Sequence, residues 1–92
     1  MWKYDWDVEK AEVNRRKHGV TFEEAEEVLV DPRSEDRRDA QHSFGDDRIR
    51  TIGYTARSRL MVVITSVGGP RPRIISARRA TKRERREYEA RP

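Results

Sequence analysis

An apolar stripe at helical spacing predicts a helix that begins after Thr21 and ends at Asp31-Pro32, because the residue before a proline disfavours helical dihedral angles. The stripe consists of Phe22, Ala25, Val28 and Leu29. Thr21 and Glu24 have the spacing of a capping box, in which each side chain accepts the other residue's backbone N–H. The start of this helix is therefore encoded locally.

A weaker helical pattern precedes it over residues 8–17, with Asp7 as the expected N-cap and Gly19 at the C-terminal cap. Its apolar stripe is thin, so light packing is expected. Residues 1–6 alternate aromatic and polar side chains, which predicts a short strand with its aromatic residues on one face. These aromatic residues are Trp2, Tyr4 and Trp6.

Three β-rich runs follow in the second half of the chain and predict three strands. The runs are residues 48–54, 59–66 and 72–78. A turn over 67–71 separates the second run from the third. Residues 60–64 are apolar without alternation, which predicts a central strand covered on both faces. An edge strand is expected near Glu35 to Gln41.

A second capping box, Thr81 to Glu84, predicts the start of a final helix. This helix is polar nearly all round, so it is expected to have little to bury against its own core. Such a helix would be exposed, frayed or held by a partner.

Composition narrows the classes of protein. A chain of 92 residues without cysteine has the length of one domain over 1–92, no disulfide framework and no thiolate metal site, which fits the cytoplasm. No apolar run is long enough to span a membrane, and the first 20 residues lack the apolar centre of a secretory signal. With only 34% hydrophobic residues, the core is small and a partner chain could complete it.

Charge is concentrated at the C-terminus. The net charge is +4, but residues 71–92 carry nine basic and three acidic side chains, a net of +6. Such a block attracts polyanions because phosphate neutralisation releases condensed counterions. A solvated tail without a binding role explains the same block equally well.

The two histidines are the first candidates for chemistry. His42 lies near Asp46 and Asp47 in the sequence, a set that could ligate a metal ion, but an Asp-rich turn explains these residues without metal and is the favoured interpretation. An imidazole can also act as a general base. His42 is favoured for this role over His18, which is expected to complement a helix dipole.

Arginines at the end of a strand are the strongest candidates for phosphate chemistry. Arg78 and Arg79 end an apolar strand, and guanidinium groups bind phosphate oxygens in a bidentate manner. Alternation places the two on opposite faces, and Arg78, which shares a face with Ile74 and Ser76, is preferred. The candidate catalytic set is Arg78, Arg79, His42, Lys82 and Tyr88, and the candidate RNA-binding set is Arg83, Arg85, Arg86, Tyr54 and Lys17. The alternatives are ion pairs between these arginines and Glu84, Glu87 and Glu89, and packing roles for both tyrosines.

Two motifs at the ends of the chain carry a resemblance to a known family. The first comprises Trp6-Asp7, Lys10-Ala11, Asn14, Lys17-His18-Gly19-Val20, Phe22, Glu24-Ala25 and Asp31-Pro32. The second runs from Arg73 to Thr81 and continues with Glu84-Arg85 and Tyr88-Glu89. Between them, Arg59-Leu60, Val62-Val63 and His42-Ser43 with Gly45 also fit. Together these motifs resemble the BrnT family of bacterial toxins.

The resemblance implies an α+β, RelE-like fold: a small antiparallel-rich sheet with two N-terminal helices packed on it and a basic C-terminal helix. It implies a toxin of a type II toxin–antitoxin system, an endoribonuclease that needs no metal or other cofactor. Such a toxin promotes attack of a 2′-hydroxyl on the adjacent phosphate of RNA, free or on the ribosome, and so inhibits translation.

The resemblance also implies partners. These are a BrnA-type antitoxin with a dimeric ribbon-helix-helix DNA-binding part, and promoter DNA reached through that antitoxin. Two toxins and two antitoxins would form the complex. A non-catalytic nucleic-acid-binding or regulatory subunit is the alternative function, because binding needs cations but no proton transfer.

Overall fold

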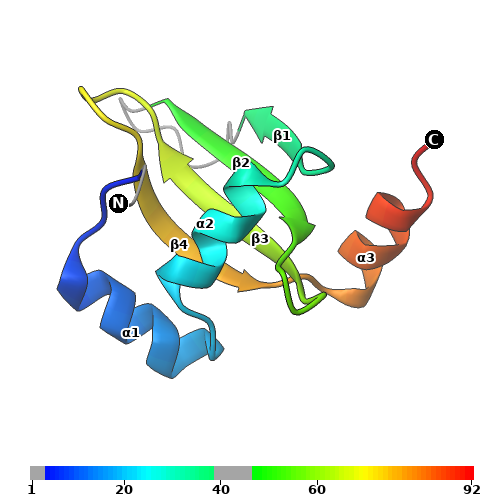
Figure 1. The fold of residues 1–92 in the computed structure, drawn as a ribbon, viewed down its shortest axis with the longest axis horizontal. Helices are drawn as coiled ribbons and strands as arrows, with labels where there is room; N and C mark the ends of the chain where they lie inside the picture. The colour runs from blue at the N-terminus through cyan, green and yellow to red at the C-terminus, as the bar shows by residue number, and fades with distance from the viewer. Residues whose placement is uncertain (1–3, 39–46) are drawn as a thin grey trace.

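One antiparallel sheet organises the chain in the computed structural model, which describes residues 4–38 and 47–92 (Figure 1). Within these residues the sheet has four strands in the order β1-β2-β3-β4, and three helices accompany it. The elements are α1 (Val8–His18), α2 (Phe22–Val30), β1 (Glu35–Arg38), β2 (Arg48–Tyr54), β3 (Leu60–Ser66), β4 (Arg73–Arg79) and α3 (Lys82–Glu89). The α+β class is confirmed, and so is the predicted order of elements from residue 8 onwards within the described residues. No helix of the described residues has the length and hydropathy needed to cross a membrane.

The caps that start and end the helices are those predicted from the sequence. The Asp7 carboxylate accepts from the backbone N–H of Glu9 at 2.8 Å, and Gly19 ends α1 in the left-handed region at φ 69°. Both capping boxes form, at Thr21 for α2 and at Thr81 for α3. Local side-chain chemistry therefore fixes where each helix begins.

The main core lies on the face of the sheet that α2 crosses and α1 borders, here called the helix-covered face (Figure 1). Phe22 and Val28 of α2 are fully buried there against Met61 and Val63 of β3. Ile74 and Ala77 of β4 and Val20 and Ala25 complete the buried cluster. The predicted stripe of α2 is thus confirmed as core.

The first helix is held by a buried polar contact as well as by apolar packing. Ala11 packs against the main core as its thin stripe predicts, but Val8, the other expected member of that stripe, is exposed, as is Val13. Asn14 is buried, and its side-chain amide donates to the carbonyl of Ala77 at 2.8 Å and accepts from the Ala77 N–H at 3.1 Å. This pair of bonds satisfies the backbone of β4 at its unpaired edge, so one asparagine replaces a neighbouring strand.

The opposite face, here called the open face, carries a second, smaller core at one end. Ile52, Leu60 and Val62 are buried there with Tyr88 of α3. Because Met61 and Val63 lie in the main core, β3 is covered on both faces where α3 packs, as its unbroken apolar run predicts.

The expectation that α3 has little to bury against its own core is wrong. Tyr88 is only 8% exposed and contacts the Tyr54 ring edge-on, with ring centroids 5.8 Å apart. Its hydroxyl donates to the carbonyl of Arg33 at 2.7 Å, and the Arg91 guanidinium stacks 3.7 Å from its ring centroid. One aromatic residue therefore secures a helix whose other positions are polar.

A strand over residues 1–6 is not formed in the described part of that segment. Asp5 makes an isolated parallel bridge to Arg73, with Asp5 N–H donating to Pro72 and Ile74 N–H donating to Asp5. The N-cap of α1 at Asp7 follows at once, which leaves no room for a longer pairing. Tyr4 and Trp6 pack against the main core, and Trp2 lies outside the described residues.

A bulge in β4 changes which of its side chains share a face. Ser76 pairs with Ile64 and Ile74 pairs with Thr65, so Ile75 is an extra residue in β4. Ile74 and Ala77 consequently both reach the main core although they are three positions apart. The predicted shared face of Arg78, Ser76 and Ile74 is thus right for Ser76 and wrong for Ile74.

Candidate functional site

The open face carries a set of arginines next to the small core. By register, Arg50 of β2 lies opposite Arg37 of β1 on one side and opposite Ile64 of β3 on the other. Arg78 of β4 pairs with Val62, whose side chain belongs to the core on this face. Strand alternation therefore brings Arg50 and Arg78 to one surface from opposite sides of β3.

Glu84 of α3 joins these two arginines. Its carboxylate accepts from Arg78 Nη1 at 2.8 Å and from Arg78 Nη2 at 2.9 Å, which is a bidentate pair. The same carboxylate accepts from Nη2 of Arg50 and from the backbone N–H of Thr81 at 2.8 Å. A residue of the capping box thus also ties α3 to two strands of the sheet.

The electrostatics of this cluster favour a fixed charge state. Hydrogen bonding to Arg78 lowers the pKa of Glu84 to about 2, with smaller contributions from the Thr81 amide and from Arg50 that together outweigh its desolvation. The same pairing raises the pKa of Arg78. All three groups are charged at neutral pH, so the cluster holds two positive charges and one negative charge.

The cluster borders a shallow hollow of about 90 Å³ that is open to solvent. Its lining residues are Glu35, Arg37, Arg50, Ile52, Glu84, Glu87, Tyr88 and Arg91. The Arg78 side chain is 39% exposed and that of Arg50 is 30% exposed, so both guanidinium groups also face water. Preorganised guanidinium groups at such a place can bind a phosphate and stabilise charge that develops on it.

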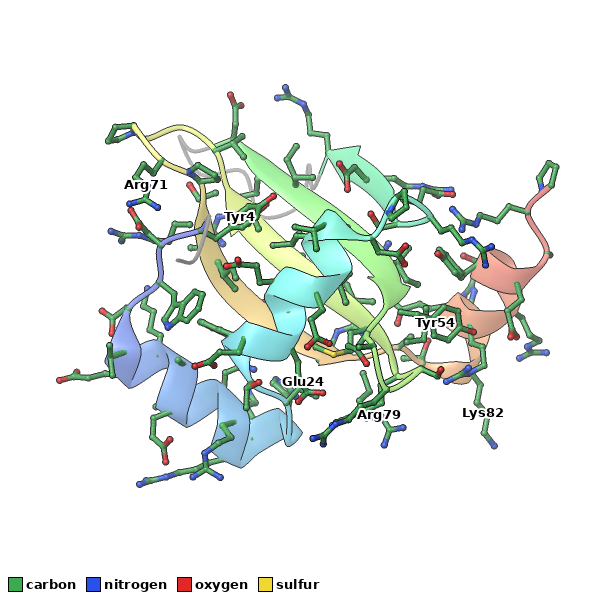
Figure 2. All side chains as sticks on the ribbon, viewed as in Figure 1. Tyr4, Glu24, Tyr54, Arg71, Arg79 and Lys82 are labelled. Carbon is green, nitrogen blue, oxygen red and sulfur yellow. The ribbon has the colours of Figure 1, made fainter. Side chains whose placement is uncertain are left out.

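Tyrosines frame the site in two different ways. Tyr54 lies beside α3 (Figure 2), where its hydroxyl donates to Glu89 at 3.2 Å and accepts from Arg85 Nη1 at 3.4 Å. Burial raises the pKa of Tyr88, whose hydroxyl already donates to a carbonyl. This geometry favours a packing role for Tyr88, whereas Tyr54 remains a rim residue that can contact a ligand.

Other members of the predicted set do not join the cluster. Arg79 lies on the helix-covered side of β4, opposite Met61, and is exposed. Lys82 extends from α3 away from the ribbon (Figure 2), and Lys17 belongs to α1, at the other end of the molecule from α3 (Figure 1). Arg83 pairs with Glu87 at 3.3 Å, and Arg86 is exposed.

His42 and Asp46, which carried the general-base and metal hypotheses, lie outside the described residues. Among the residues that the structure does describe, no group of three or more His, Cys, Asp or Glu side chains is placed to hold a metal ion.

Sequence reasoning gave Glu84 only as a cap and as an ion-pair alternative, and it did not single out Arg50. The alternative in which arginines pair with the glutamates of the tail is confirmed for Arg78 with Glu84 and for Arg83 with Glu87. A signal for Arg50 exists in the strand pattern, because Arg48, Arg50, Ile52 and Tyr54 alternate along one face of β2.

Comparison with known proteins places the chain in a family of known class. The family model described as "Ribonuclease toxin, BrnT, of type II toxin-antitoxin system" matches residues 6–84. The match covers most of the chain, so the chain belongs to a family of ribonuclease toxins of type II toxin–antitoxin systems.

A solved structure agrees with that class. The fold is similar to the 1.1 Å crystal structure of the Brucella abortus ribonuclease toxin, BrnT, with a TM-score of 0.66 and 26% identity. The match covers 89% of this chain and 100% of the Brucella chain. No curated protein matched the sequence. The chain belongs to the BrnT family, as its two end motifs predict.

Proposed function

We propose that this BrnT-family toxin is an endoribonuclease that cleaves RNA without a metal ion, at the arginine cluster on the open face. The observation that carries the proposal is the convergence of Arg50 and Arg78 on one carboxylate at a solvent-open surface. Two guanidinium groups held in place by Glu84 supply the positive charge that a metal supplies in other nucleases.

The proposed reaction is an internal phosphoryl transfer. A ribose 2′-oxygen forms a bond to the adjacent phosphorus, and the bond from phosphorus to the 5′-oxygen of the next nucleotide breaks. A general base takes the 2′-hydroxyl proton, and a general acid gives a proton to the departing 5′-oxygen. The products are a 2′,3′-cyclic phosphate and a 5′-hydroxyl end.

Arg78 and Arg50 are assigned to the phosphate, because their guanidinium N–H groups can follow the negative charge as the phosphorus becomes five-coordinate. Glu84 is a positioning residue, since a carboxylate with a pKa of about 2 is a poor proton acceptor at neutral pH. His42 is proposed as the general base, and Lys82, Arg85 and Tyr54 as contacts to neighbouring nucleotides. The packing of Tyr88 argues against a proton-transfer role for that residue.

The cellular role follows from the family. We propose that cleavage of cytoplasmic RNA inhibits translation, and that a BrnA-type antitoxin with a ribbon-helix-helix DNA-binding part neutralises the toxin. Two toxins and two antitoxins would assemble and repress their promoter. That the antitoxin covers residues 71–92 stays a prediction. It is supported by the positive charge of that segment, and no longer by the expectation that α3 has no apolar contact with its own core.

Incubation of the purified chain with RNA in EDTA, alone and in a translating extract, tests the proposal. Cleavage that persists in EDTA and leaves 2′,3′-cyclic or 3′-phosphate ends is the expected result. Intact RNA in both settings would reject the enzyme. Retarded but uncut RNA would support the alternative of a nucleic-acid-binding subunit.

A further inference from the structure

A second cationic surface lies at the end of the sheet that is farthest from α3. There the start of β4, the end of β3 and the first turns of α1 surround a hollow of about 370 Å³, here called the hairpin groove. Its basic residues are Lys10, Arg48, Arg71 and Arg73. Figure 2 shows Arg71 near this end of the molecule and Lys82 at the opposite end.

The groove has a large excess of positive charge. Among the described residues that line it, Asp5 is the one acidic side chain, and it pairs with Arg71 at 3.3 Å. Four basic groups and one acidic group give a local charge of +3. Like charges from three separate segments repel one another, so their convergence favours an anionic ligand.

Several of these cations are not committed to protein partners. Within residues 4–38 and 47–92, no hydrogen bond or ion pair holds the side chain of Lys10, Arg48 or Arg73. The Nε of Arg48 is buried and has no hydrogen-bond partner there, in contrast to Arg50, which is bound to Glu84. The groove therefore offers guanidinium and ammonium N–H groups to a ligand.

Two arginines of the groove lie, by strand register, on the same face of the sheet as the arginine cluster. Arg48 lies two residues before Arg50 on the same face of β2, and Ser66 connects Arg48 to Arg73 across the sheet. Arg78 and Arg73 are separated by four pairs along β3, roughly 13 Å at the usual rise per strand residue. A single strand that crosses the open face from the cluster therefore reaches the groove within a few nucleotides.

The hairpin leaves the groove accessible to a polymer. Gly68 and Gly69 line it without side chains, and a Cβ at Gly69 would meet only the Arg71 carbonyl at 3.9 Å. The backbone of a nucleic acid can approach such a turn closely, and exposed backbone N–H groups add hydrogen-bond donors for phosphate.

We propose that the hairpin groove is a binding subsite for RNA backbone phosphates that flank the cleaved bond. The proposal rests on the proposed function in that it takes the RNA substrate from it. The groove contributes to affinity and to the placement of the strand, not to the chemical step. It reads charge rather than base sequence, because the residues that line it present cations and backbone instead of stacking surfaces.

The test compares two charge-matched double variants. Arg48→Gln with Arg73→Gln removes two charges from the groove, and Arg16→Gln with Arg57→Gln removes two exposed charges from α1 and from the β2–β3 turn. The ligand is a 2′-O-methyl RNA, which cannot be cleaved, and binding is measured against salt concentration. The groove variant should bind more weakly and lower the salt slope by about 1.4, since each phosphate contact on a single strand contributes about 0.7.

Cleavage of ordinary RNA adds a second readout. The groove variant should raise KM and leave kcat unchanged. Two shortened RNAs, one truncated on the 5′ side of the cleavage point and one on the 3′ side, then locate the subsite. The increase in KM should disappear with the RNA that no longer reaches the groove. Lys10→Gln with Arg73→Gln, both at exposed positions, repeats the test without the half-buried Arg48. This second variant guards against loss of folding.

The outcomes separate the two proposals. Absence of cleavage by the wild type would reject the proposed reaction while the salt slope still tests the groove. Equal slopes for the groove variant and its control would overturn the groove. A groove variant that binds RNA normally but binds the antitoxin weakly would overturn it too, and would assign the surface to a protein partner.

Discussion

The two faces of the sheet use their buried groups differently. On the helix-covered face, eight residues form one buried apolar cluster beneath α2 and beside α1. On the open face, the buried cluster has four members at one end, and arginines extend beyond it. An antiparallel sheet can leave one face to water, and this chain does so on the face where Arg50 and Arg78 meet Glu84. The main core and the proposed site for chemistry thus lie on opposite faces of one sheet, so substitutions can probe the two separately.

The largest effect is expected at Arg78. Arg78→Ala should lower the cleavage rate at saturating RNA by roughly 10²-fold or more, the scale seen when one charge-stabilising donor is lost. Arg79→Ala removes the same charge from the other face and should change the rate by less than tenfold. Arg85→Ala should mainly weaken binding and reduce its salt slope by about 0.7. Equal losses of rate at all three positions in single-turnover assays would show that the basic tail acts only as a diffuse cationic surface.

On the helix-covered face, substitution of Asn14 should lower the stability of the protein. Asn14→Ala leaves the buried N–H and carbonyl of Ala77 without partners, so the free energy of unfolding should fall by about 3 kcal/mol. Urea titration measures this loss, and Val13→Ala, at an exposed position on the same helix, is the matched control. The folded fraction should keep its cleavage rate. A change in stability no larger than that of the control would show that Asn14 does not hold α1 to β4.

On the open face, the contribution of Glu84 to stability should depend on pH. Its pKa is about 2 in the folded protein against 4.5 in an ordinary glutamate, so its contribution to stability is complete above pH 4.5 and is lost as the pH falls towards 2. A shift of this size corresponds to at most about 3 kcal/mol. Glu84→Gln keeps a residue that suits the capping box but removes the charge, so it should lower stability at pH 7 and flatten the loss below pH 4.5.

The control for Glu84 is Glu12, whose pKa is also about 2 because of hydrogen bonds with Arg15 and Arg16 at the surface of α1. Solvent screens that exposed pair, so Glu12→Gln should leave the acid limb of the stability curve close to that of the wild type. Identical curves for the Glu84 variant and the wild type would show that the arginine cluster contributes nothing to folding.

A smaller steric effect is expected at Gly53. A Cβ there would lie 2.9 Å from Cβ of Ser34 and 3.2 Å from Cγ1 of Val28, on the helix-covered face. Gly53→Ala should therefore destabilise the fold by about 1–2 kcal/mol through overpacking. Gly69→Ala, whose Cβ would meet the Arg71 carbonyl at an ordinary contact distance of 3.9 Å, should change stability by less than about 0.5 kcal/mol. Thermal unfolding of the two variants gives the comparison, and similar midpoints would contradict it.

The helices and strands could be predicted because their signals are local. Thr21, Glu24 and the apolar stripe of α2 lie within one short segment, and the unbroken apolar run of β3 reports its own burial on two faces. The end of β1 could not be tested beyond Arg38, since residues 39–46 lie outside the described residues. The three later strands are reproduced to within one residue, whereas the alternation of aromatic residues over 1–6 wrongly predicted a strand.

The site could be predicted only in part because it depends on pairing across the chain. Arg50 and Glu84 are 34 residues apart, and nothing in either segment alone shows that α3 returns to β2. The anchor at Tyr88 depends on the carbonyl of Arg33, which no side-chain pattern reveals. The preference for Arg78 over Arg79 rested on alternation along β4, and the structure places Arg78 on the open face although the bulge breaks that alternation upstream.

The bulge at Ile75 has a consequence for how related chains are aligned. The extra residue shifts the alternation of side chains along β4 by one position. The face on which an arginine lies can therefore be predicted by counting back from α3, but not by counting forward from the β3–β4 hairpin. Without the extra residue, and with α3 in the same place, Arg78 would stay on the open face while the residues between the hairpin and Ile75 would change faces. An insertion or deletion near Ile75 would therefore alter the hairpin groove, which includes Arg73, while the arginine cluster at Arg78 keeps its face.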